Sequence, residues 1–195
     1  MKYALALALS LLTATVLADS WPAAKIAGIA SPTGQVVVRV VPGTNLDATY
    51  GFSGAQRGQA ATAVFYRLDP AANYVKYREV SLLNPIAPVF AAVSDSGELV
   101  TLDNWHNMGL GDSVLVVYSP EGTVRRSYRL TDIYAKSEIN TFDRSTSSIW
   151  WRCPSAPILE PRTSALELMD ALGANVEISL KTGAVKRNPT AQKGC

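Results

Sequence analysis

The sequence has few of the residues that mark a common catalytic or metal site. It contains one histidine, His106, and two cysteines among 195 residues. A single histidine excludes a His-rich zinc site. The patterns G-x-S-x-G, S-x-x-K, H-E-x-x-H and C-x-x-C are all absent, so no motif of the corresponding hydrolases, metalloproteases or thiol redox proteins is present. We therefore assign no catalytic residue, no metal and no cofactor.

Charge is scarce as well. Charged residues make up 17% of the chain and the formal net charge is +2. A nucleic-acid-binding protein normally carries a much larger basic excess, so nucleic acid is not an expected partner. Hydrophobic residues make up 48%, which excludes disorder for most of the length.

The amino-terminal residues have the pattern of a secretion signal. Lys2 precedes an apolar run at 3–12, and Val16 and Ala18 supply small residues for cleavage after position 18. The run is shorter than the roughly 20 residues that a membrane-spanning helix needs. The sequence thus predicts a signal peptide at 1–18 and a single β-rich domain at 19–195, located in the periplasm or secreted. We expect no membrane span after cleavage.

The two cysteines, Cys153 and Cys195, are expected to form a disulfide in an oxidising compartment. The bond would close a loop of about 43 residues and stabilise the fold by roughly 4 kcal/mol at most in the chain-entropy model. A catalytic thiol is the alternative, but it would require a nearby base, and the only histidine lies far upstream of Cys153.

Four glycines indicate hairpin turns. Each stands fourth in a short polar stretch that an aliphatic residue soon follows, the order required by a type I turn that ends in a left-handed residue. The glycines are Gly34, Gly97, Gly122 and Gly183. Strands are predicted around these turns and between them, at 36–41, 62–68, 74–82, 89–93, 99–102, 114–118, 124–128, 176–180 and 184–186. The run at 114–118 is apolar throughout, as in a central strand buried on both faces.

Helical signals are few. Ser164 and Glu167 form a capping-box pattern before an apolar stretch, and Gly173 follows, so a helix is predicted at 165–172. A second short helix is predicted from 132 to about 136. The proline-rich segment 152–162 is expected to be extended. The fold class is therefore mainly β: an antiparallel β-sandwich or open propeller-blade-like sheets with one or two short helices.

Four stretches, SPTGQVVVRVVPG, LNPIAPVFAAVSDSGELVTLDNW, VVYSPEGTVRRSYRL and STSSIWWRC, resemble a group of uncharacterised exported bacterial β-rich proteins with blade-like hairpins. The resemblance extends over residues 31–153. It implies an exported β-rich fold and implies no catalytic residue.

The loop at 103–112 is the richest polar cluster. One interpretation is a ligand contact, with stacking on Trp105 and hydrogen bonding to His106 or Asp103. The candidate binding residues in it are Asp103, Asn104, Trp105, His106, Asn107 and Asp112. A Ca²⁺ loop is a weaker alternative, because the spacing matches no EF-hand. A purely structural connection, with Trp105 covering the edge of the core, is the interpretation that we favour over both.

Trp150, Trp151 and Arg152 form the second candidate cluster. In a strand the two indoles would point to opposite faces, leaving one available for a protein or carbohydrate contact beside Arg152. The structural alternative packs both indoles inside.

Three functional hypotheses follow. The first is an exported, non-catalytic binding protein of the cell envelope, with an unidentified protein or glycan as its partner. The second is an envelope glycan or peptide hydrolase that uses paired carboxylates, which have no sequence signature. The third is a purely structural or inhibitor-like protein.

Overall fold

The computed structural model describes residues 21–44, 58–190 and 194–195, and within them the chain forms three four-stranded antiparallel sheets. The first contains β1 (Ala27–Ala30), β2 (Val36–Val41), β3 (Thr62–Leu68) and β4 (Tyr74–Ser81). The second contains β5 (Pro88–Val93), β6 (Leu99–Asn104), β7 (Leu115–Tyr118) and β8 (Val124–Tyr128). The third contains β9 (Ile158–Glu160), β10 (Ala165–Met169), β11 (Ala174–Ser179) and β12 (Val185–Pro189).

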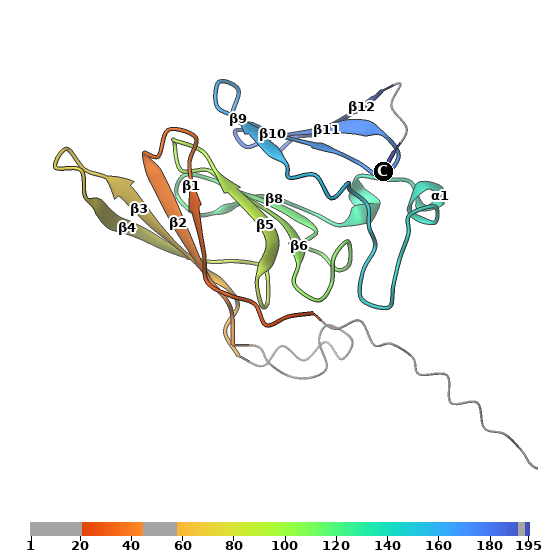
Figure 1. The fold of residues 1–195 in the computed structure, drawn as a ribbon, viewed down its shortest axis with the longest axis horizontal. Coiled ribbons are helices and arrows are strands. Elements are labelled where there is room, and N and C mark those ends of the chain that lie inside the picture. The colour runs from red at the N-terminus through yellow and green to blue at the C-terminus, as the bar shows by residue number, and fades with distance from the viewer. Residues whose placement is uncertain (1–20, 45–57, 191–193) are drawn as a thin grey trace, which may run out of the picture.

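Strands that are consecutive in the chain are neighbours in each sheet, so every sheet is a simple meander. Figure 1 shows the three sheets side by side in an open stack, with the second in the middle. The first strand of the second sheet, β5, is an edge strand and packs beside β1 of the first sheet. The mainly β, antiparallel architecture predicted from the sequence is confirmed. The predicted signal peptide at 1–18 lies outside the described residues.

Two hydrophobic cores hold the stack together, one on each face of the second sheet. Val116 and Tyr118 of β7 point into the core shared with the first sheet. Leu115 and Val117 of the same strand point into the core shared with the third sheet. Every residue of β6 and β7 is buried. The prediction that the 114–118 segment is covered on both faces is therefore confirmed.

The four predicted glycine turns are confirmed by their backbone angles. The φ values are +74° at Gly34, +95° at Gly97, +88° at Gly122 and +75° at Gly183. In the second sheet the amide of Gly97 donates to the Ser94 carbonyl at 3.0 Å, and that of Gly122 donates to the Ser119 carbonyl at 2.9 Å. These are the turns that join β5 to β6 and β7 to β8.

Substitution by alanine should destabilise the protein more at Gly122 than at Gly34, a turn glycine with a similar φ. A Cβ at Gly122 would meet Val80 Cγ2 at 2.4 Å, whereas a Cβ at Gly34 would meet only the Tyr74 hydroxyl at 3.6 Å. Both positions have positive φ, so alanine at either is expected to cost about 1 kcal/mol of backbone strain. Gly122→Ala should lose about 1–2 kcal/mol more than Gly34→Ala in urea unfolding, because overpacking adds to the strain. Equal losses would contradict the close approach of β4 to this turn.

Tyr118, in the core between the first and second sheets, makes the stability of the protein pH-dependent. Its side chain is fully buried and its hydroxyl oxygen accepts the Leu83 amide at 2.8 Å. Its pKa is raised to about 12, chiefly because burial disfavours the phenolate. The folded state thus holds the phenolic proton more tightly than the unfolded chain, whose tyrosine pKa is about 10.

The resulting stability is complete below pH 10 and is lost as the pH rises toward 12. We expect the free energy of unfolding to fall by roughly 2 kcal/mol over this window. Tyr118→Phe should be about 1 kcal/mol less stable at pH 7, from the lost hydrogen bond, yet show a smaller alkaline loss than wild type. Urea unfolding at several pH values checks this, and parallel pH profiles would refute it.

The predicted helix at 165–172 is wrong, because this segment forms β10. Leu166 and Leu168 are buried and Glu167 is exposed, an alternation with the period of a strand. Pairing with β9 and β11 on both sides overrides the local capping pattern. Gly173, with φ +86°, ends a tight turn that begins at Asp170 instead of stopping a helix.

Helix is nearly absent from the described residues. The chain forms a 3₁₀ turn at Leu130–Asp132 and one short α-helix, α1, at Lys136–Ile139. The helix predicted at 132–136 overlaps each of them by one residue, and the residues between are not helical. Strands β1 and β9 were not predicted as strands, although β9 lies in the segment expected to be extended.

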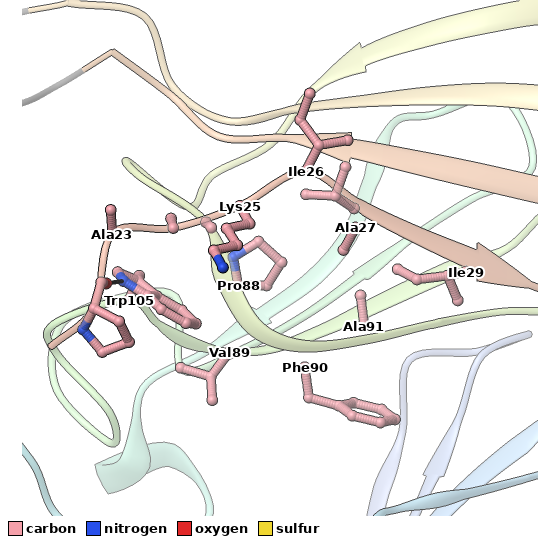
Figure 2. Close-up of a pocket in the computed structure, with 14 residues that line it drawn as sticks. Ala23, Lys25, Ile26, Ala27, Ile29, Pro88, Val89, Phe90, Ala91 and Trp105 are labelled. Carbon is pink, nitrogen blue, oxygen red and sulfur yellow. Dashed lines mark hydrogen bonds between the residues drawn. The ribbon is translucent and has the colours of Figure 1, made fainter.

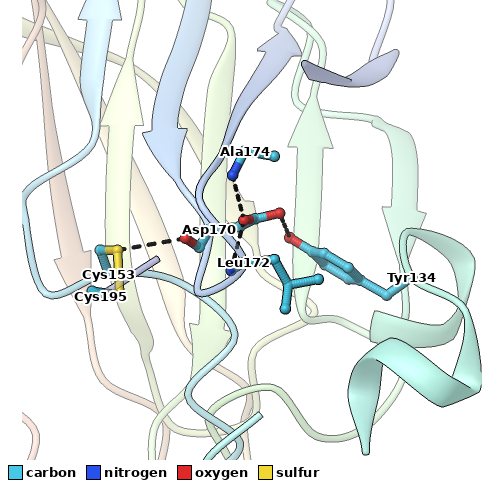
Figure 3. The surroundings of a disulfide bond; sticks show 6 residues. All are labelled: Tyr134, Cys153, Asp170, Leu172, Ala174 and Cys195. Carbon is cyan, nitrogen blue, oxygen red and sulfur yellow. Dashed lines mark hydrogen bonds between the residues drawn. A yellow bond between two sulfur atoms is a disulfide. The ribbon is translucent and has the colours of Figure 1, made fainter. Parts of the chain in front are cut away.

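The predicted disulfide between Cys153 and Cys195 is present, with the two Cα atoms 5.5 Å apart. The backbone amide of Cys153 donates to the Met169 carbonyl at 2.9 Å, at the end of β10. The bond therefore attaches the carboxyl terminus to the third sheet, beside Asp170 (Figure 3).

Candidate binding site

Asp103 is the next-to-last residue of β6 and the centre of a buried polar network. Its Oδ1 accepts the Trp151 indole N–H at 2.8 Å and the Gly109 amide at 2.9 Å, while Oδ2 accepts Arg152 Nε at 3.0 Å. Its backbone φ is +60°. Burial raises the pKa of Asp103, and Arg152 and the other donors act against that rise. The structure thus joins Asp103 to Trp151 and Arg152, which the sequence placed in separate clusters.

The side chain of Asn104 also forms a hydrogen bond within the protein. The Nδ2 of Asn84, a fully buried residue, donates to Asn104 Oδ1 at 2.8 Å and to the Asp103 carbonyl at 3.1 Å. Asp112 is exposed further along the loop. The oxygens proposed for a Ca²⁺ loop therefore do not converge. Among the described residues there is no group of three or more His, Cys, Asp or Glu side chains that could hold a metal ion.

Trp105 follows at the surface and is half-buried. Its indole N–H donates to the Pro22 carbonyl at 2.9 Å, and its backbone amide donates to the Ala87 carbonyl at 2.9 Å. The ring of Trp21 packs edge-on against it, with centroids 5.2 Å apart. The chain's own segment at 21–22 thus covers part of the loop that contains the candidate binding residues.

His106 and Asn107 are likewise half-buried. The imidazole of His106 lies 5.7 Å from the ring of Trp21, centroid to centroid. Its pKa is lowered by partial burial, which favours the neutral form near pH 7. No sequence signal linked Trp21 to this loop, because more than 80 residues separate Trp21 and Trp105.

The second cluster is divided between the interior and the surface. Trp151 is fully buried, and Trp150 is 41% exposed. The side chain of Arg152 is only 11% exposed and turns inward to Asp103. Arg152 therefore does not accompany Trp150 at the surface, which removes the basis for a joint Trp–Arg contact site.

A cavity of about 470 Å³, which we call the Trp105 groove, lies beside Trp105. Figure 2 shows the groove between the segment at 22–29 and the start of β5, with Trp105 at one end. Its lining is dominated by alanine, proline and aliphatic side chains, and among the described residues Lys25 is the only charged one and no carboxylate lines it. The groove has the volume typical of ligand pockets. Of the predicted site residues, Trp105 alone lines it.

Asp170 forms a second buried polar centre that the sequence did not indicate. Its Oδ1 accepts the amides of Leu172 and Ala174, and its Oδ2 accepts the Tyr134 hydroxyl at 3.2 Å (Figure 3). Arg187 Nε also donates to Oδ2, at 3.2 Å. Burial, and then the charge of Asp170, raise the pKa of Tyr134. Asp103 and Asp170 are thus each paired with an arginine, and neither lines the Trp105 groove.

Comparisons of the chain with protein-family models, with curated proteins and with solved structures found no match. The functional assignment therefore depends on the geometry of the site.

Proposed function

We propose that this chain is a non-catalytic binding protein of the cell envelope that holds an apolar ligand, or an apolar segment of a partner, in the Trp105 groove. The observation that carries the proposal is the lining of the groove, which is apolar apart from Lys25. A hydrolase with paired carboxylates needs two acidic groups facing one cleft, and this groove has none. The lining also favours a hydrophobic ligand over a glycan, because buried hydroxyl groups require hydrogen-bond partners.

Export to the periplasm or beyond is part of the proposal. The Cys153–Cys195 disulfide supports it, because disulfides persist mainly in oxidising compartments. The signal pattern at 1–18 and the resemblance to exported proteins agree with it and stay predictions. No helix among the described residues is long and apolar enough to cross a membrane.

Affinity capture from the native envelope tests the binding role. The wild-type protein and a Trp105→Ala, His106→Ala double variant are used as baits, and captured proteins and lipophilic molecules are identified by mass spectrometry. We expect the double variant to recover at least about tenfold less of the ligand, since burial of an aromatic surface supplies much of the energy of a contact site. Trp150→Ala, which removes an exposed indole outside the groove lining, is the control. Equal recovery by the wild type and the double variant would show that the groove is not the contact site.

A further inference from the structure

The Trp105 groove lies between two chain segments, 22–29 and 87–91. Trp105 stands at one end of it and Ile29 and Ala91 lie toward the other (Figure 2). Several side chains along these segments are small, including Ala23, Ala27, Ala87 and Ala91. These small side chains leave an apolar slot between the two segments, which can accept a hydrocarbon chain.

The charge at the groove is equally distinctive. Lys25 is exposed on the wall, and it forms no ion pair with any residue in the described part of the chain. Figure 2 draws Lys25 on the 22–29 segment, among the apolar side chains of the lining. A single cation beside an apolar slot is complementary to a ligand with one negative group and a hydrocarbon tail.

We propose that the Trp105 groove binds the monoanion of a free medium-chain fatty acid. The alkyl chain lies along the slot between β5 and the 22–29 segment, and the carboxylate pairs with the ammonium group of Lys25. This inference rests on the proposed binding function and names the ligand class. Burial of the methylene groups provides most of the affinity, and Lys25 provides the preference for an anion.

The test uses a neutral fluorescent probe, N-phenylnaphthylamine, and its displacement by three ligands with the same dodecyl chain. The ligands are laurate, dodecanol and dodecyltrimethylammonium, each kept below its micelle concentration. We expect laurate to displace the probe at the lowest concentration. Lys25→Glu should weaken laurate about fivefold or more and leave dodecanol unchanged, because the exposed ammonium group interacts only with the charged head. Lys186→Glu, at an exposed position of β12, is the charge-matched control.

Two neighbouring residues of β1 locate the binding. Ala27 lines the groove, whereas a Cβ at Gly28 would meet nothing within 4 Å. Ala27→Trp should fill the slot and weaken the binding of probe and laurate at least tenfold, while Gly28→Trp should bind both like wild type. Near-identical urea unfolding of the two variants shows that the loss is not caused by misfolding.

The outcomes separate the ligand class from the binding function. If the probe binds in an Ala27-dependent manner but laurate is no better than dodecanol or dodecyltrimethylammonium, the fatty-acid assignment is overturned and the groove remains a binding site. Failure of the probe and of all three ligands to bind would overturn both. Displacement of the probe by a hydrophobic peptide alone would identify a protein segment as the occupant and also reject the fatty acid.

Discussion

Replacing Asp103 with alanine should lower the free energy of unfolding by about 3–5 kcal/mol, the largest effect that we expect from any single substitution. The change leaves the nearly buried guanidinium of Arg152 without its partner and removes the acceptor of the Trp151 indole and the Gly109 amide. A buried charge or donor that loses its partner costs far more than the intact pair contributes. The loss should be read from urea unfolding at pH 7.

Two other substitutions separate the causes of that loss. Asp103→Asn keeps an oxygen acceptor and tolerates the positive φ of +60°, so it should cost less than alanine while still weakening the contact with Arg152. Asp112→Ala changes an exposed residue of the same loop and should stay within about 0.5 kcal/mol of wild type. A cost below about 1 kcal/mol for Asp103→Ala would contradict the network.

Loss of the Cys153–Cys195 disulfide should be the second large effect. A double Cys→Ala variant is expected to unfold with roughly 2–4 kcal/mol less free energy than the oxidised protein, because the bond restricts a loop of about 43 residues in the unfolded chain. The disulfide also holds the carboxyl terminus in contact with the third sheet, and loss of these contacts would add to the destabilisation. Gly194 lies so close to Ala171 that a Cβ would stand 1.8 Å from its carbonyl oxygen, and Thr190 Oγ1 donates to the Gly173 carbonyl at 2.6 Å.

Urea unfolding of the oxidised protein, the reduced protein and the double variant measures the effect. Reduction and substitution should give similar losses, since both remove the same constraint on the unfolded chain. Peptide mapping by mass spectrometry without reduction should recover the peptides of Cys153 and Cys195 joined together. Free thiols at both positions in the unreduced protein would contradict the bond.

The strands were predictable where turn chemistry and side-chain patterns agree. Gly34, Gly97, Gly122 and Gly183 marked hairpins correctly, because only glycine adopts positive φ there without strain. The strand at 36–41 matches β2 residue for residue. The prediction failed at 165–172, where Ser164 and Glu167 satisfy a local helix signal but pairing with the adjacent strands β9 and β11 decides the structure.

The candidate site was predictable only in part. Trp105 was identified from the composition of its loop, and it does line the groove. Lys25, which provides the charge, and Asn84, which holds the end of β6, carried no signal, because each becomes meaningful only through contacts with residues far away in sequence. The same holds for Asp103, whose partners Trp151 and Arg152 follow almost fifty residues later. Local patterns cannot report such long-range pairing.

The central claim, that the Trp105 groove is a ligand site, is tested most directly by NMR of methyl-labelled protein during a laurate titration. Saturable shifts are predicted for the methyl groups of Ala27, Ile29, Ala87 and Ala91, which line the groove. Leu172, which is exposed in the turn between β10 and β11 and does not line the groove, should stay unchanged. Shifts that do not saturate, or that leave the groove methyls in place while others move, would contradict the account.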